Sequence, residues 1–343
     1  MKKLFWLVLP ALAFLVSCSN KFKVGAPYKE VTAVYCLLSK TDTAHYVKVV
    51  KGFYDEVLDN LLLAQNVDSI YYDSLDVKFE EINNGSVVAT FPLTKVNLIN
   101  EGYVKKDGVF AITPSYAYKF TASLNPSRTY RLIVKNVFTG KTMTAETSVI
   151  SDQLLKVEYP LTIDDGLNFS NYIKDYSFIF SAPTNAVICD VQLRFYYSEK
   201  NVLKPDSVSK KYVDLTLANN ILNPGGQIRY ALPNINFFRV LNSELGAAPE
   251  NIIRLIDTPD VVFLGGGSVL KTYMDVQLAQ GGGITYDQIK PTYTNFTGED
   301  VYGILSTRVV KRIKGIPFTS ATVDSMINGI YTKNLNIVGV TPD

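Results

Sequence analysis

Apolar positions along this chain gather in short runs, rich in β-branched and aromatic residues, that polar turn-forming residues separate. Residues 31–38 and 45–50 are two such runs, on either side of the polar segment 39–43. Residues 77–82 and 87–91 flank Asn-Asn-Gly-Ser, a strong hairpin turn signal. Because no long helical pattern lies between the runs, the chain is predicted to form antiparallel hairpins.

Further runs extend this series, and helical patterns are short and few. The next runs cover residues 116–122, 129–135, 143–149 and 191–196. The last of them alternates apolar and polar residues, which predicts a strand with one buried and one exposed face. The predicted helices are 55–65, 235–245 and 321–328, the last behind the capping candidates Thr319 and Ser320.

The chain is long enough for two domains. About 325 residues remain once the N-terminal leader described below is removed, and a single hydrophobic core rarely extends over that many residues. The early strands end near residue 151. We therefore predict a mostly β protein with two antiparallel β-sandwich domains, immunoglobulin- or fibronectin-like, and a few short helices. Their predicted bounds are 29–151 and 152–343.

The first residues have the pattern of a bacterial lipoprotein signal. Lys2 and Lys3 precede a 13-residue run from Leu4 to Val16, and Cys18 follows at the predicted cleavage point. This run spans ~20 Å as a helix, which is short of the ~30 Å hydrocarbon core of a bilayer. Residues 1–17 are therefore predicted to be a signal peptide, and 18–28 a tether whose Cys18 carries fatty acyl chains such as palmitate. Two or three chains anchor a protein stably.

Charge makes nucleic acid an unexpected partner. Removal of Lys2 and Lys3 would leave 32 basic and 32 acidic residues. The densest basic cluster, Lys311 and Arg312 with Lys314, is interpreted as a solvated strand face. A neutral chain offers no broad basic field to a phosphate backbone.

Two cysteines remain beyond Cys18. Cys36 and Cys189 each lie within an apolar run, so buried free thiols are predicted. An oxidising envelope compartment also permits a disulfide between them. The sequence leaves this pairing open.

The residues that could serve catalysis or phosphate binding are better explained by roles in the fold. The glycine triplets 265–267 and 281–283 lack the Lys-Ser/Thr ending of a phosphate loop, so we interpret them as turns or close backbone approaches. His45 is the only histidine and begins a predicted strand, where a structural role is expected. No catalytic residue is assigned.

No metal or cofactor site is predicted either. One histidine and two scattered cysteines do not make the usual zinc site. Residues 164–168, Asp-Asp-Gly-Leu-Asn, offer oxygen ligands for a cation, but they lack EF-hand spacing and are interpreted as a turn. A hydrolase with two carboxylates far apart in the sequence stays open as a third hypothesis.

Aromatic residues are abundant, with 22 Tyr and 18 Phe. Exposed aromatics on a sandwich stack on sugars or anchor protein partners. The pairs 71–72 and 196–197 are candidates for such contacts, although tyrosines in strands more often divide between core and surface. The only tryptophan, Trp6, lies in the predicted leader.

Five short segments match Asp, then Ser or Thr, then an apolar residue, and resemble the O-glycosylation sequon of exported Bacteroidota proteins. Glycans at such positions protect and solubilise loops. The candidate acceptor residues are Thr43, Ser69, Ser74, Ser207 and Ser325.

Two segments near the C-terminus resemble an uncharacterised family of Bacteroidota outer-membrane lipoproteins with β-sandwich domains. Residues 290–296, Lys-Pro-Thr-Tyr-Thr-Asn-Phe, and 301–308, Val-Tyr-Gly-Ile-Leu-Ser-Thr-Arg, carry this resemblance. Leu305 stands where the family usually has an aromatic, and Thr307 where it has serine. The resemblance implies a compartment and a fold, and it brings no catalytic residues.

These observations predict a lipid-anchored outer-membrane protein that acts as a non-enzymatic binding module, with an envelope protein or a glycan as partner. The alternative is a structural component of a surface assembly, such as an adhesin or secretion apparatus. Residues 19–23 lack the acidic stretch that directs many lipoproteins of this phylum outward. The sequence therefore leaves the periplasmic and surface faces open.

Overall fold

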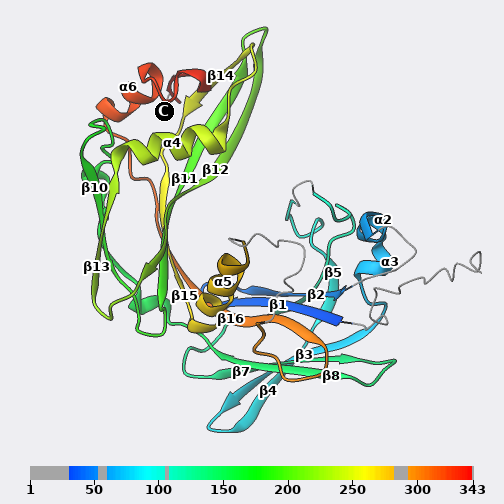
Figure 1. Ribbon diagram of the computed structural model, residues 1–343. Coiled ribbons are helices and arrows are strands. Elements are labelled where there is room, and N and C mark those ends of the chain that lie inside the picture. Colours follow the sequence, from blue (N-terminus) through cyan, green and yellow to red (C-terminus); the bar gives the residue numbers. More distant parts are fainter. Residues whose placement is uncertain (1–30, 53–59, 105–107, 282–292, 342–343) are drawn as a thin grey trace, which may run out of the picture.

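The computed structural model describes residues 31–52, 60–104, 108–281 and 293–341, and it is mostly β, with several sheets and few short helices (Figure 1). The predicted leader, Cys18 and the tether lie outside the described residues.

One large sheet runs through both halves of the molecule. Its strand order is β17-β14-β11-β15-β16-β1-β2-β6-β5, and β12 pairs with β11 outside this order. The strands are β17 (Ile337–Val340), β14 (Ile252–Ile256), β11 (Ile188–Asn201), β15 (Asp260–Gly266), β16 (Val301–Ile313), β1 (Val31–Ser39), β2 (Ala44–Gly52), β6 (Tyr116–Thr121), β5 (Thr94–Asn97) and β12 (Lys204–Leu222).

Two smaller sheets accompany it. One has the order β4-β3-β7-β8 and the other β13-β10-β9. Their strands are β4 (Ser86–Pro92), β3 (Leu75–Asn83), β7 (Thr129–Asn136), β8 (Thr142–Ser148), β13 (Gln227–Pro233), β10 (Asp175–Ser181) and β9 (Lys156–Tyr159).

The first core lies between the four-stranded sheet and β1, β2 and β6 of the large sheet. Val34 from β1, Phe79 from β3 and Leu132 from β7 are fully buried in it. The rings of Phe79 and Phe120 lie 4.9 Å apart between centroids, so the two layers face each other across one apolar interior.

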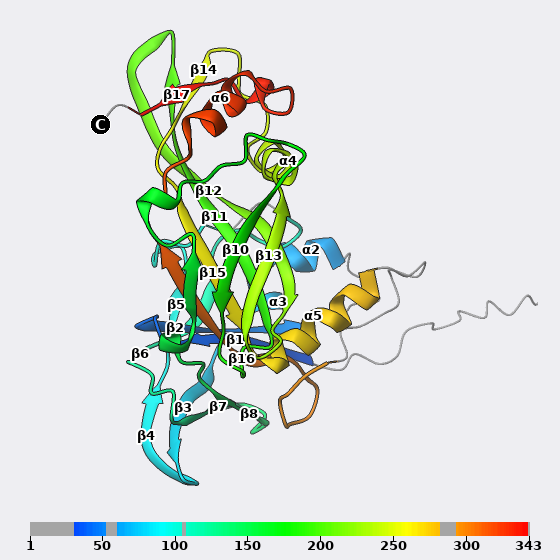
Figure 2. The same ribbon diagram turned by 90° about the vertical axis from the view of Figure 1, so that its left-hand side faces the viewer.

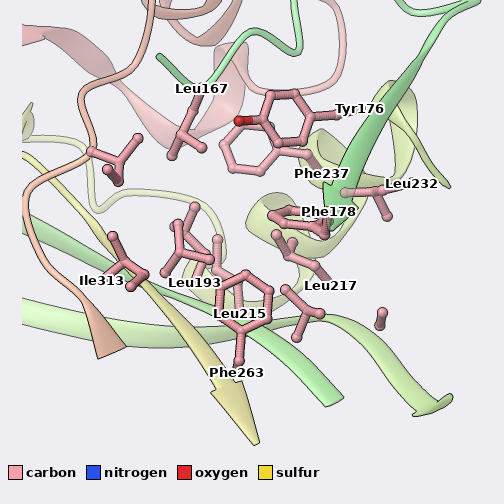
Figure 3. Packing of buried hydrophobic residues seen from close by; sticks show 14 of the residues in the cluster. Leu167, Tyr176, Phe178, Leu193, Leu215, Leu217, Leu232, Phe237, Phe263 and Ile313 are labelled. Carbon is pink, nitrogen blue, oxygen red and sulfur yellow. The ribbon is translucent and has the colours of Figure 1, made fainter. Parts of the chain in front are cut away.

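The second core lies on one face of β11 and β15, where the three-stranded sheet and helix α4 (Asn234–Leu245) cover it (Figures 1 and 2). Figure 3 shows Phe178, Phe237 and Phe263 gathered in this interior. Helix α6 (Ser320–Asn328) adds Met326, which is fully buried.

Strand β16 belongs to both cores. Its residues 301–308 pair with β1 in parallel, and residues 308–313 pair with β15 in antiparallel. Leu305 is buried in the first core and Val309 in the second. The predicted boundary at 151 falls between β8 and the short 3-10 helix η1 (Asp152–Leu154), but Phe296, Val301 and Leu305 return to the first core.

Two strand pairs differ from the antiparallel expectation. β1 with β16 and β14 with β17 are parallel. A parallel pair needs a long connection between its strands, and most of the chain lies between β1 and β16 in the sequence. Local hairpin signals carry no information about such a pairing.

The predicted hairpins are confirmed. β1 pairs with β2, and β3 pairs with β4 through Asn84 and Gly85, both of which have positive φ angles. The predicted helix at 235–245 is α4, and the one at 321–328 is α6, whose cap Thr319 accepts a hydrogen bond from the backbone N–H of Thr322.

Two of the remaining α-helices were not predicted. Within the predicted helix 55–65 the described part is α2 (Asn60–Gln65). The unpredicted α-helices are α3 (Val67–Ile70) and α5 (Ser268–Gly281), the second of which follows the glycines that end β15. Two further 3-10 helices are η2 (Ile163–Asp165) and η3 (Lys333–Leu335).

Candidate functional site

The face of the large sheet that points away from the second core carries a hollow of about 560 Å³, which we call the outer-face groove. Ligand sites in proteins commonly measure ~300–1,000 Å³. Its lining residues are Thr41, Asp42, Gln192, Arg194, Asp214, Val262, Leu264, Arg308, Val310 and Arg312.

Strand alternation divides β11 between core and groove. Leu193 and Phe195 are buried in the second core, while Gln192 and Arg194 line the groove. Because successive side chains in a strand point to opposite faces, the even-numbered residues here share the outer face.

Neighbouring strands extend the same face. The register places Gln192 opposite Val262, and Val262 opposite Arg312. Leu264 pairs in the same way with Val310. The floor of the groove is therefore apolar, and charged side chains surround it.

Arg194 is held by Asp214 on the neighbouring strand. Its Nε and Nη2 donate to the two carboxylate oxygens of Asp214 at 2.7 and 2.8 Å. Hydrogen bonding to this carboxylate raises the pKa of Arg194 above its ordinary value. The guanidinium also lies 4.3 Å from the ring centroid of Tyr212, whose side chain is exposed.

Arg312 belongs to a more buried network. Its Nη1 lies 3.2 Å from Oδ2 of Asp260, which is only 6% exposed. The hydroxyl of Tyr196 donates to the same oxygen at 3.0 Å, and the backbone N–H of Gly315 donates to the other. Asp260 therefore fixes one end of the groove.

Arg308 connects the sheet to the β1–β2 turn. Its Nη2 lies 3.2 Å from Oδ2 of Asp42, while its Nε is buried and has no hydrogen-bond partner. An unpaired buried donor costs free energy. Arg308 therefore lines the groove with Nη2 bonded to Asp42, and its buried Nε lacks a partner.

The arrangement is suited to binding oxygen-rich ligands. The lining holds three arginines and two aspartates, with Gln192 and Thr41 as further polar groups. Within the described residues, no group of three or more His, Cys, Asp or Glu side chains could hold a metal ion.

His45 takes a structural place in β2. It is 2% exposed, its Nε2 lies 3.1 Å from the carbonyl oxygen of Ala122, and its ring lies 4.8 Å from that of Phe120. Burial lowers its pKa below the ordinary value.

The two described cysteines are free and buried, as predicted from their apolar surroundings. Burial raises the pKa of the Cys36 and Cys189 thiols to about 12. Both side chains belong to strands of the large sheet, but Cys36 lies in the first core and Cys189 in the second.

The segments interpreted as turns or close approaches take different forms: residues 163–165 form the 3-10 helix η2, whereas Gly265 and Gly266 lie within β15. Asp165 accepts hydrogen bonds from the backbone N–H groups of Thr162 and Leu161, which lower its pKa. Gly265 allows a close approach, since a Cβ there would lie 2.8 Å from the side chain of Val309. Residues 282 and 283 of the second triplet lie outside the described residues.

The tyrosine pairs divide between core and surface. Tyr71 and Tyr72 are buried, and the hydroxyl of Tyr72 lies 2.6 Å from that of Thr32. Tyr197 packs against the second core, whereas Tyr196 stands beside the groove.

The five predicted glycosylation acceptors fall in different settings, and their modification stays a prediction. Thr43, Ser74 and Ser207 are exposed. Ser69 and Ser325 are half-buried within α3 and α6, and the hydroxyl of Ser325 donates to the carbonyl of Ala321.

Sequence reasoning missed the groove as a site. The alternation at 191–196 and the basic residue Arg312 were visible, but Asp42 and Arg308 meet across 266 positions of sequence. Only the parallel pairing of β1 with β16 brings them together.

No protein-family model matches the chain, and no curated protein matches it. Among solved structures, it is similar to the C-terminal globular domain of an oligosaccharyltransferase from Pyrococcus abyssi, with 11% sequence identity and a TM-score of 0.19. The similarity covers 85% of this chain and 50% of that one, so the chain spans half the length of that structure. In the part of the chain that the structure describes, no helix is long and apolar enough to cross a membrane.

Proposed function

We propose that the protein is a lipid-anchored envelope protein that acts as a non-enzymatic binding module, and that its partner occupies the outer-face groove. The observation that carries this proposal is the groove itself: an apolar floor, three arginines and an unpaired donor on Arg308. Such a mixture of apolar surface and a few placed polar groups is typical of binding sites.

Binding is favoured over hydrolysis by the state of the carboxylates. Both oxygens of Asp214 accept hydrogen bonds from Arg194, and both oxygens of Asp260 are engaged. A general acid needs a protonated carboxyl. Because the oxygens of Asp214 and Asp260 already accept hydrogen bonds, we interpret these carboxylates as groups that position the arginines.

The proposal also includes the lipid anchor at Cys18 and the type of domain. Acylation of Cys18 would tether the protein to the outer membrane, and the resemblance at 301–308 supports this address. We also propose that the two cores correspond to two β-sandwich domains of the immunoglobulin or fibronectin type. The facing layers around Phe79 support this for the first.

Site-specific photo-crosslinking in cells tests the proposed function. A photoreactive phenylalanine at Gln192 should capture a partner, whether protein or glycan. The same residue at Arg131, on the outer face of the four-stranded sheet, should not. Equal yields at the two positions, or none at Gln192, would contradict the proposal.

A role in a surface assembly is the second candidate, and β12 favours it. This 19-residue strand pairs only with β11 among the described strands, so one of its edges is free. Free edges accept a further strand from another chain. A stable complex in membrane extracts that is lost on Val208→Pro would support this role, whereas a free monomer would exclude it.

Protease treatment of intact cells distinguishes the two faces of the outer membrane. Cleavage without lysis would indicate the surface and favour capture or adhesion. Protection until lysis would indicate the periplasm and favour an assembly role.

A further inference from the structure

We infer that the outer-face groove binds a short oligosaccharide that carries carboxylate groups, such as a segment of a uronic-acid polymer. This inference rests on the proposed function, because it names the ligand class of the same groove.

The groove has more hydrogen-bond donors than acceptors. Each of its three guanidinium groups carries five N–H donors. Each arginine has one carboxylate partner: Asp214 for Arg194, Asp42 for Arg308 and the buried Asp260 for Arg312. Arg308 and Arg312 each contact that carboxylate through a single terminal nitrogen, so other N–H groups of these two guanidiniums are left for a ligand. The Nε of Arg308 is buried without a partner. A carboxylate is the acceptor that best matches the planar donor edge of arginine.

The spacing of the arginines fits an extended ligand. Arg308 and Arg312 share one face of β16 and are four residues apart, which corresponds to ~13 Å at ~3.3 Å per residue. Val310 lies between them on the same face. A ligand that reaches both arginines must therefore cross an apolar floor, and the C–H faces of sugar rings suit such a floor.

The position of the groove disfavours an extended peptide. The strands beneath it, β11, β15 and β16, are bonded to each other, so their backbone groups are already paired. Peptides recruited by strand addition bind at sheet edges. A ligand on this face is recognised by side chains alone, and the exposed ring of Tyr212 beside Arg194 adds a surface on which a sugar can pack.

Calorimetric titration tests the inference with two named probes. Tetragalacturonate should bind the purified chain, and cellotetraose, a neutral tetrasaccharide, should bind at least tenfold more weakly. Affinity for tetragalacturonate should fall as salt is raised, because charge attraction is screened.

Variants assign the binding to the groove. Arg308→Gln should weaken tetragalacturonate at least tenfold, and Arg308→Lys should lose less because it keeps the charge. Asp42→Asn should tighten binding severalfold, since it removes a competing carboxylate, and an unfolded protein cannot give this result. Arg131→Gln is the matched control, because Arg131 is also a surface arginine with carboxylate partners and lies on the other sheet.

Three results would overturn the inference. They are absence of tetragalacturonate binding, equal binding of cellotetraose, and binding that Arg308→Gln and Asp42→Asn leave unchanged. If tetragalacturonate does not bind while the photoreactive residue at position 192 still cross-links to a partner in cells, the ligand class is wrong and the proposed function stands. If both fail, the proposed function is also wrong.

Discussion

The two faces of strand β11 have different tasks. On its inner face, Leu193 and Phe195 are almost fully buried in the second core. On its outer face, Gln192 and Arg194 line a polar groove. One strand thus supplies both stability and a binding surface, and the period of two along the backbone separates them. Substitutions on the inner face should cost stability, and those on the outer face should cost binding.

The largest effect is expected on the inner face. Phe263→Ala should lower the free energy of unfolding by about 3–5 kcal/mol, because it removes a fully buried ring and leaves a cavity. Leu264→Ala, one residue along β15 on the outer face, should cost less than half as much. Urea unfolding of both variants measures the difference, and equal losses would contradict the division of the two faces.

Two arginines allow the same comparison between a buried and a groove position, now for charged side chains. Arg254 is 4% exposed, and it donates to Glu199 and to the carbonyls of Gly246 and Leu335. Arg254→Ala should cost about 3–5 kcal/mol, because it removes the packing of a nearly buried side chain and the donor to two backbone carbonyls, although Glu199 keeps its contact with Lys211.

Arg194→Ala in the groove should cost less than about 1 kcal/mol, as surface pairs usually do. Chemical denaturation compares the two variants. A larger loss for Arg194 would assign the groove arginines to the fold instead of to binding.

Gly303 tests the part of β16 that joins β1. It has a φ of 98°, and a Cβ there would lie 2.0 Å from the carbonyl oxygen of Val34. Gly303→Ala should therefore cost about 2–4 kcal/mol from strain and overpacking. Gly85→Ala has a positive φ but open space, so it should cost only about 1 kcal/mol. Equal melting temperatures for the two variants would refute a packing role for Gly303.

The smallest effect concerns pH. Burial lowers the pKa of His45 below its ordinary value of 6.5, so the unfolded chain binds more protons at this position than the folded chain. The contribution of neutral His45 to the free energy of unfolding should be fully present above about pH 6.5, and it should be lost as the pH falls towards the folded-state pKa of this histidine. His45→Gln should show a smaller loss between pH 7 and pH 5 in thermal melts. An identical slope in both proteins would exclude His45 as the cause.

Local features were predictable from the sequence, and long-range ones were not. The hairpin at 77–91 carries its own turn residues, and α6 carries its own cap. The parallel pairing of β1 with β16 has no local signal, because the partners lie at opposite ends of the chain. The same pairing brings Arg308 to Asp42, which is why the groove could not be assembled from sequence patterns.

The fold explains several residues of the C-terminal motif at 290–296 and 301–308. The side chain of Asn295 exchanges two hydrogen bonds with the backbone of Leu305, and Thr307 accepts one from the backbone N–H of Ile150. These residues hold the junction between the cores. Arg308, the last residue of the motif, points into the groove instead.

The central claim is that the outer face binds and the inner face maintains the fold. The most direct measurement is photo-crosslinking at Gln192 in cells that carry Arg194→Gln and Arg308→Gln together, with the melting temperature of the purified variant recorded in parallel. We predict a lost cross-link and a melting temperature within a few degrees of the parent. A cross-link that persists at full yield would contradict the claim.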